Sequence, residues 1–250
     1  MTPLQIRIKA FGIHLALSII VITLFLLIAT QIWYPGPLFK LEDVWQGLQI
    51  LIPVDAILGP ILTLLLYVPG KKGLKFDLTV IAILQVGALA YGGMLIYKQR
   101  PVAYAFVADR FEVVLASEEY FDDIPMERFT GYDGSFPLMT YVLPPQSSKE
   151  RSEFLINGIN IKKLAERHYP IRPNIKAIAK KSIDLDKLLQ SNEESKKIIN
   201  NFLSANQNIS ELVFLPLQSS AYESIVLAID GKTGLIKTYI YLDPWNTGLK

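Results

Sequence analysis

Three long apolar runs dominate the first 97 residues of this 250-residue chain. They are Phe11–Trp33, Leu48–Val68 and Leu78–Tyr97, and within them only His14 and Asp55 can carry a charge. About 20 helical residues at about 1.5 Å each cross a bilayer core. Buried helices of soluble proteins rarely run this far without a charge. The chain is therefore predicted to cross a membrane three times. Because no small-x-small cleavage site follows the first run, we interpret it as a retained span.

The basic residues that flank these spans predict their orientation, because Lys and Arg concentrate in cytoplasmic loops. Five lie before the first span or between the second and third: Arg7, Lys9, Lys71, Lys72 and Lys75. The opposite side has Lys40, Lys98 and Arg100. This imbalance predicts a cytoplasmic N-terminus and places residues 98–250 across the membrane. Trp33 and Tyr34 lie at a span end, as interfacial aromatic residues do.

Residues 98–250 have the mixed polarity of a water-exposed domain and contain 19 basic and 19 acidic residues. A neutral domain lacks the positive footprint of nucleic-acid binding. The chain has no cysteine, which excludes disulfides, thiolate metal sites and a cysteine nucleophile. The two histidines lie in different halves, so we expect no zinc site, no catalytic triad and no cofactor. Gly231-Lys232-Thr233 lacks the first glycine of a phosphate-binding loop, where Val226 stands.

Hydrophobic patterns predict a small α+β fold for this domain. We expect strands at 102–115, 138–143, 212–217, 224–229 and 235–242, and helical segments at 117–128, 147–167 and 183–203, the last capped by Ser182. The final two strands flank Asp230-Gly231-Lys232-Thr233-Gly234, a sequence typical of a hairpin turn. Trp245 follows the last strand, and we expect it to be largely buried on the sheet.

Asp55 is the most informative single residue, because a carboxylate within a span is costly unless it is paired, protonated or hydrated. Pro53, Gly59 and Pro60 surround it. Proline removes a helical donor, so Pro60 is expected to free the carbonyl of Ala56 and kink the helix into a polar notch. Three roles for Asp55 stay open: a hydrogen bond to another span, a grip on a partner's transmembrane segment, or proton or ion coupling. Small residues on the third span predict close helix approach: Gly87, Ala88, Gly92 and Gly93.

Several motifs together resemble the type IV pilin accessory proteins, inner-membrane proteins of Gram-negative bacteria. They are Lys9-Ala10-Phe11 with His14, Trp33-Tyr34-Pro35-Gly36-Pro37-Leu38, Val54-Asp55-Ala56-Ile57-Leu58-Gly59-Pro60, Pro69 to Asp77, Arg100-Pro101, Asp109-Arg110-Phe111-Glu112 and Asp243-Pro244-Trp245. The membrane half matches closely, and residues 116–210 match little. The resemblance implies help to a pilin, by stabilising it, delivering it to the assembly machine or tuning pilus extension and retraction, and the family has no established enzymatic activity. In such an inner membrane, the orientation predicted from the basic residues makes residues 98–250 a periplasmic domain.

The leading hypothesis is a non-enzymatic assembly factor that contacts the pilin's transmembrane helix and periplasmic head, and also the pilus assembly platform. Its candidate residues for partner binding or structure are Asp55, Pro53, Gly59, Pro60, Trp33, Tyr34, Pro35 and Trp245. The alternative is a membrane-tethered sensor whose periplasmic domain binds a ligand and acts through a partner. An enzyme ranks last, because the spans hold one carboxylate and no nucleophile and base set.

Overall fold

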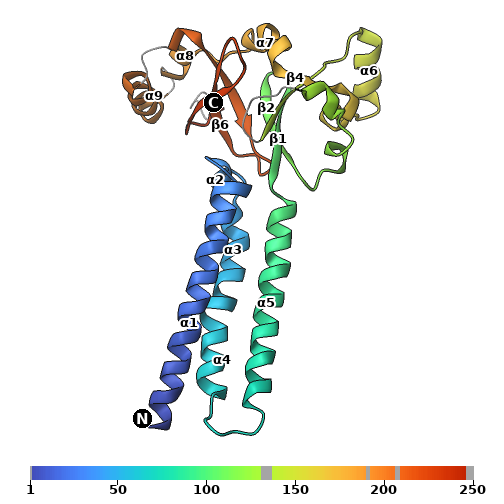
Figure 1. The fold of residues 1–250 in the computed structure, drawn as a ribbon. Helices are drawn as coiled ribbons and strands as arrows, with labels where there is room; N and C mark the ends of the chain where they lie inside the picture. Colours follow the sequence, from blue (N-terminus) through green and yellow to red (C-terminus); the bar gives the residue numbers. More distant parts are fainter. Residues whose placement is uncertain (1, 131–136, 190–191, 206–208, 246–250) are drawn as a thin grey trace. The chain divides into compact units, whose positions relative to one another are not determined.

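The computed structural model describes residues 2–130, 137–189, 192–205 and 209–245. The chain divides into two compact units, residues 1–100 and residues 101–250. Three long apolar helical segments form the first unit, and a mixed seven-stranded sheet with helices forms the second. The predicted fold class, a three-span membrane protein with an α+β domain, is confirmed (Figure 1).

Each membrane span contains one long helical path, and two of the three paths change helix type along their length. The first consists of α1 (Pro3–Ile28) and the π-helical η1 (Ala29–Trp33). The second consists of α3 (Val44–Pro53), the π-helical η2 (Val54–Leu58) and α4 (Gly59–Leu66), and the third is α5 (Leu74–Lys98). The short α2 (Leu38–Leu41) lies between the first two paths. The α1 helix begins before the predicted apolar run, because Thr2 and Gln5 form a reciprocal capping box.

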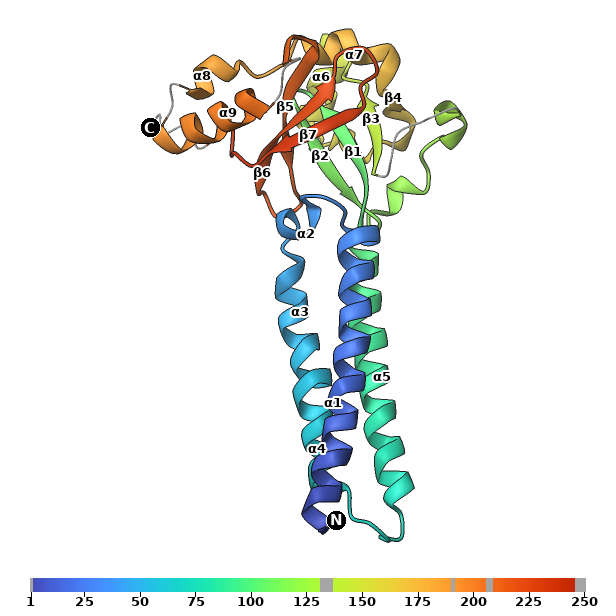
Figure 2. The same ribbon diagram turned by 60° about the vertical axis from the view of Figure 1, so that its left-hand side comes forward.

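The middle span contacts both of its neighbours. The α1 helix packs along α4 and η2, while α5 packs against α3 and α4 (Figures 1 and 2). Glycines permit this approach, since a Cβ on Gly92 would lie 2.3 Å from Leu51 Cδ1 and one on Gly93 3.0 Å from Phe25 Cε2. The prediction of close packing is wrong for Gly87, which has no neighbour within 4 Å of its Cβ position.

The domain is built on one mixed sheet with the strand order β4-β3-β1-β2-β5-β6-β7 (Figure 2). Pairs β1–β3 and β2–β5 are parallel, and the other neighbours are antiparallel. The strands are β1 (Pro101–Val107), β2 (Arg110–Leu115), β3 (Leu138–Val142), β4 (His168–Pro170), β5 (Leu212–Gln218), β6 (Ser224–Asp230) and β7 (Ile236–Ile240). Strands β1 and β6 are buried over six successive residues, which indicates a sheet covered on both faces.

The predicted strand at 102–115 is wrong as a single element. It is a tight hairpin, β1 and β2, that turns at Ala108 and Asp109. Ala108 has a φ of 58°, a left-handed conformation that an alanine rarely adopts. The sequence has no glycine or asparagine at this point to indicate a turn.

Two apolar clusters lie on the same face of the sheet, according to the strand register. One gathers around Ala103, Val114 and Leu138. The other gathers around Phe214 and Val226, where the helices α8 (Leu185–Leu189) and α9 (Glu193–Ala205) pack. The core therefore extends across the sheet rather than collecting at its centre.

The helical predictions for the domain need three corrections. The segment 117–128 contains two 3₁₀ turns, Glu119–Phe121 and Met126–Phe129, because Pro125 prevents a continuous helix. The segment 183–203 is two helices, α8 (Leu185–Leu189) and α9 (Glu193–Ala205). Ser182 is no N-cap, since its Oγ accepts the N–H of Phe214 on β5 at 3.0 Å.

Two elements were missed entirely, and one predicted helix is shorter than expected. Within 147–167 only α6 (Ser148–Ile156) is α-helical, followed by 3₁₀ turns at Ile161–Lys163 and Ala165–Arg167. Strand β4 and helix α7 (Ile171–Ala179) were not predicted. The prolines at 170 and 173 concealed both, although Pro173 lies in the first turn of α7, where proline is tolerated.

Candidate functional site

The second span changes its hydrogen-bond register at Asp55. Residues Val54–Leu58 form a π-helical turn, in which the N–H of Gly59 reaches back to the carbonyl of Val54. The next bond in this pattern would run from residue 60 to Asp55, but Pro60 has no N–H. Pro60 therefore leaves the carbonyl of Asp55 without a donor in this π pattern, in addition to the Ala56 carbonyl that the sequence predicts it to free.

Gln85 of α5 supplies the missing donor. Its Nε2 donates to the backbone oxygen of Asp55 at 3.2 Å. Gly59 makes room for this contact, because a Cβ there would lie 2.1 Å from the same nitrogen. Gly59 and Pro60 are both buried, whereas Pro53 is exposed at the end of α3. The two candidates after Asp55 thus have a defined structural role.

His14 of α1 completes a polar cluster that joins all three spans. Its Nδ1 lies 2.6 Å from Thr63 Oγ1 on α4, and its Nε2 lies 2.7 Å from Gln85 Oε1. Because the amide oxygen can only accept, Nε2 carries the hydrogen. We call His14, Asp55, Thr63 and Gln85 the bundle cluster.

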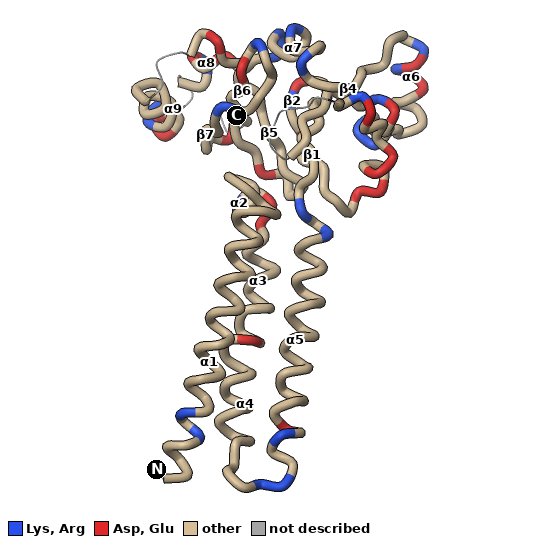
Figure 3. Tube along the Cα trace, viewed as in Figure 1, with Lys and Arg blue, Asp and Glu red and all other residues tan. Residues whose placement is uncertain are grey.

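Asp55 has a buried carboxylate oxygen without a hydrogen-bond partner in the described part of the chain. The residue is 5% exposed, and its Oδ1 is buried with no partner among the described residues. The Gln85 side chain also interacts with the Asp55 carboxyl group, and His14 lies near it, but neither bonds to Oδ1. Figure 3 shows the spans as nearly free of charge apart from this acidic position. The cluster can therefore accept one further hydrogen bond in an apolar setting.

A hollow lies beside the cluster, between α1 and α5. It has a volume of about 290 Å³ and includes Asp55, Gln85 and Ser18 in its lining. A second hollow of about 570 Å³ shares His14 and Leu17 with it. Such an arrangement can bind a polar group in an apolar setting.

Trp33, Tyr34 and Pro35 lie at the far end of the first span and fasten it to the third. The Tyr34 hydroxyl donates to the carbonyl of Ile96 at 2.7 Å, and burial, with Glu42 nearby, raises its pKa so that it stays protonated. Trp33 packs edge-on against Tyr97, with ring centroids 5.2 Å apart. Pro35 begins the turn toward α2. These contacts are structural.

Trp245 is less buried than predicted. Its side chain is 49% exposed and lies over the guanidinium of Arg110, 4.5 Å from the ring centroid. Arg110 in turn pairs with Asp109 at 2.8 Å. The structure thus joins two motifs that are far apart in the sequence, Asp109-Arg110 and Asp243-Pro244-Trp245. Trp245 therefore packs on the guanidinium of Arg110 at the domain surface and does not fill the core.

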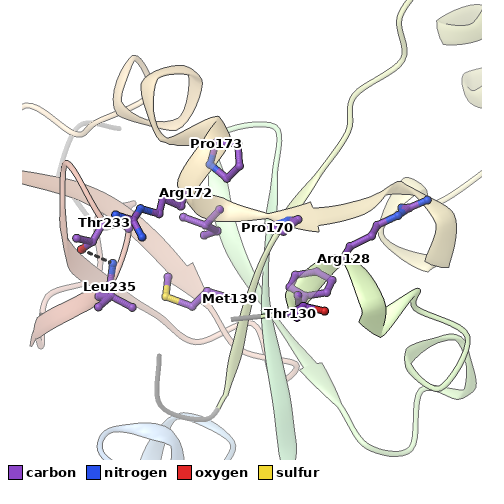
Figure 4. A pocket seen from close by; sticks show the side chains of 11 residues that line it. Arg128, Thr130, Met139, Pro170, Arg172, Pro173, Thr233 and Leu235 are labelled. Carbon is purple, nitrogen blue, oxygen red and sulfur yellow. Dashed lines mark hydrogen bonds between the residues drawn. The ribbon is translucent and has the colours of Figure 1, made fainter. Parts of the chain in front are cut away.

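A cavity of about 310 Å³ lies in the domain beside α7 and the β6–β7 turn (Figure 4). Arg172 points toward Thr233, while Arg128 points away from the hollow. The Arg128 guanidinium donates to the carbonyls of Glu166 and His168 and stacks on Tyr169. Arg128 is therefore a structural residue. In the part of the chain that the structure describes, no three His, Asp or Glu side chains gather as metal ligands would.

Sequence reasoning identified Asp55 and its glycine and prolines but missed Gln85 and Thr63 as partners. His14 was noted only as a possible charge. A useful signal was available, since each apolar run contains only a few polar residues. Polar side chains within spans tend to meet one another.

Together, the fold and the cluster define a class: a multi-pass membrane protein with three apolar spans, a polar cluster inside them and an α+β domain. The chain is 27% identical over 244 residues to the fimbrial assembly protein of serogroup I of Dichelobacter nodosus, covering 94% of this chain and 95% of the relative. It is 32% identical over 119 residues to the fimbrial assembly protein of serogroups C1 and C2 of the same organism, 47% of this chain and 91% of the relative. The chain belongs to this family of fimbrial assembly proteins.

A third relative, the fimbrial assembly protein of serogroup E1, is 31% identical over 119 residues, covering 47% of this chain and 46% of the relative. No protein-family model matches the chain, and no solved structure is significantly similar to it.

Proposed function

We propose that this protein is a non-enzymatic accessory factor of type IV pilus biogenesis. It binds or stabilises a pilin in the bacterial inner membrane and promotes its assembly or modulates pilus dynamics. The observation that carries the proposal is the similarity to a fimbrial assembly protein along 94% of the chain, through both the spans and the domain. A pilin has an apolar transmembrane helix, which the three spans could contact, and a periplasmic head, which the α+β domain could contact.

The proposed orientation places the N-terminus in the cytoplasm and the α+β domain in the periplasm. The N-terminal end of α1 and the turn between α4 and α5 lie at the same end of the bundle (Figure 3), and their sequences contain Arg7 and Lys9, and Lys71, Lys72 and Lys75. This basic end fits the cytoplasmic side. In this orientation the spans can contact the pilin and the assembly platform within the membrane, and the α+β domain can contact them in the periplasm.

A thiol-labelling experiment tests this orientation, since the chain has no native cysteine. Ser148→Cys, on exposed α6, should react with an impermeant thiol reagent in sealed spheroplasts. Lys72→Cys should react only after the membrane is opened. Lys72 is the better reporter for this turn, because neighbouring Gly73 has a φ of 94° that a cysteine would strain. The reverse labelling pattern would place the domain in the cytoplasm.

The assembly role is tested in the host bacterium by deleting the gene and restoring it in trans. Surface pili recovered by shearing should fall after deletion and return with the wild-type gene, while pilin transcript stays constant. Total pilin by immunoblot then separates stabilisation from assembly. Normal surface piliation in the deleted strain would refute the proposal.

The domain cavity favours a second candidate, a membrane-tethered sensor. Its volume of about 310 Å³ lies at the lower end of the range of small-ligand pockets. A sensor acts on gene expression through a partner, so its deletion would change pilin transcript level. An unchanged transcript with reduced piliation favours the assembly factor.

A further inference from the structure

A groove follows α1 through the half of the bundle nearer the N-terminus. The two hollows beside the bundle cluster share His14 and Leu17, and their α1 residues recur every three or four positions from Ile6 to Val21. That spacing keeps them on one helix face, which at about 1.5 Å per residue extends for about 22 Å. The opposite wall is α5, and the middle span forms the floor. The groove is long enough to hold several helical turns.

The walls are apolar and open to the bilayer. Leu17 is 57% exposed and Val86 67% exposed, one on each wall. Small residues interrupt them, namely Ala10, Ser18 and Ala82. Transmembrane helices approach one another closely where such small residues lie.

The floor contains an acceptor that lacks a donor. Asp55 lines the groove, is 5% exposed, and has no hydrogen bond to its Oδ1 among the described residues. An unpaired polar atom in this environment is costly. A lipid acyl chain could fill the apolar walls, but it brings no donor. A helix with a hydroxyl, amide or amine side chain meets both requirements.

We propose that the groove between α1 and α5 binds the transmembrane helix of the pilus subunit, and that a hydrogen-bond-donating side chain of that helix pairs with Asp55. The identity of the subunit rests on the proposed function. The groove and its acceptor rest on the geometry of the bundle. Asp55 is then the residue that selects a partner helix with a polar group at the matching depth.

Site-specific photocrosslinking in the intact membrane tests this inference. A photoreactive residue is placed at Val86 on the α5 wall, at Val21 on the α1 wall, and at Leu84 as the control. Leu84 is 63% exposed but lines neither hollow. In cells that make both proteins, positions 86 and 21 should crosslink to the pilin and position 84 should not.

Asp55→Leu should then reduce the pilin crosslink from position 86 by about three- to sixteenfold, because an intramembrane polar contact contributes about 0.6–1.7 kcal/mol. Asp55→Asn keeps an acceptor and should retain most of the crosslink. Immunoblots must show equal abundance of each variant. The photoreactive residue is tested at two wall positions, 86 and 21, so that the experiment stands if one of these two variants does not fold.

Several outcomes would overturn the inference. Crosslinks to a second copy of this chain would make the groove a self-association surface, and crosslinks to lipid alone would make it a lipid site. Equal pilin crosslinking from positions 84 and 86, or no effect of Asp55→Leu, would also refute it. The proposed function fails separately: pilin crosslinks at the groove with normal piliation after gene deletion would keep the groove and reject the assembly role.

Discussion

Each half of the chain holds one histidine with both ring nitrogens hydrogen-bonded, but the partners differ in kind. In the bundle, His14 bonds to the side chains of Thr63 and Gln85. In the domain, His168 bonds to the Thr140 hydroxyl at 2.9 Å and to the backbone carbonyl of Lys162 at 2.8 Å. Transmembrane helices satisfy their own backbones, so polar contacts between spans fall mainly to side chains. Loops around a sheet leave backbone groups available.

Besides the bond from the Tyr34 hydroxyl to the Ile96 carbonyl at the end of the bundle, a second exception to this pattern lies inside it. The carbonyl of Asp55 is available to Gln85 because a π-turn and Pro60 release it. The domain uses a buried histidine to tie β4 to β3, whereas the bundle uses its polar residues to join three spans and still has an acceptor left over. The paired side chains of His14, Gln85 and His168 therefore stabilise the fold, whereas the Oδ1 atom of Asp55 is available to a partner.

The largest predicted effect is that of Gly59→Ala in the full-length protein. The added Cβ would lie 2.1 Å from Gln85 Nε2 and would force that side chain away from the Asp55 carbonyl. Overpacking of this kind typically costs about 1–3 kcal/mol. Thermal unfolding in detergent should show a clear fall in the midpoint. The matched control is Gly87→Ala, where, among the described residues, the added Cβ would meet no atom within 4 Å beyond its own stretch of helix, and it should leave the midpoint unchanged or slightly higher.

The next effect concerns pH and belongs to the domain. Burial lowers the pKa of His168 below its usual value of about 6.5. The unfolded chain therefore binds a proton more readily, so stability is present above pH of about 6.5 and falls as the pH drops below it, by up to about 1.4 kcal/mol per pH unit. Hydrogen exchange of β3 and β4, corrected for intrinsic rates, should show weaker protection at pH 5.5 than at pH 7.5. In His168→Gln this pH dependence should disappear; if it persists, another group is responsible.

The smallest effect is expected at Trp245. A half-exposed ring over Arg110 contributes about 0.5–1 kcal/mol, less than a buried tryptophan would. Trp245→Ala should thus change the protection of β2 only slightly, and Trp245→Phe less still. A loss of several kcal/mol would show that the ring is part of the core after all.

The membrane half could be predicted largely from the sequence, because span length and the absence of charge are set by the bilayer itself. The partners of Asp55 could not, since Gln85 and Asp55 meet only after the π-turn shifts the hydrogen-bond register. The spacing of Pro60 indicated the carbonyl of Ala56 and gave no sign that the carbonyl of Asp55 would also need a donor.

The domain was harder to predict for local reasons. Ala108 turns the first strand back without a glycine, so β1 and β2 appeared as one element. Ser182 has the residue type of a helix cap but bonds to β5, which no local pattern indicates. The β6–β7 turn was easier, because the Asp230 carboxylate accepts the N–H groups of Lys232 and Thr233, a local arrangement typical of Asp in turns.

We infer that Gln85 holds the bundle together while Asp55 is kept for a partner. The direct test compares the thermal stability of Gln85→Leu and Asp55→Leu in the purified full-length protein, with no pilin present. Gln85→Leu should be clearly destabilised, because it leaves His14 Nε2 and the Asp55 carbonyl unpaired. Asp55→Leu should stay close to the wild type, since any residue at 55 offers the same backbone carbonyl. If Asp55→Leu instead loses as much stability as Gln85→Leu, the carboxylate is part of the scaffold and the claim is contradicted.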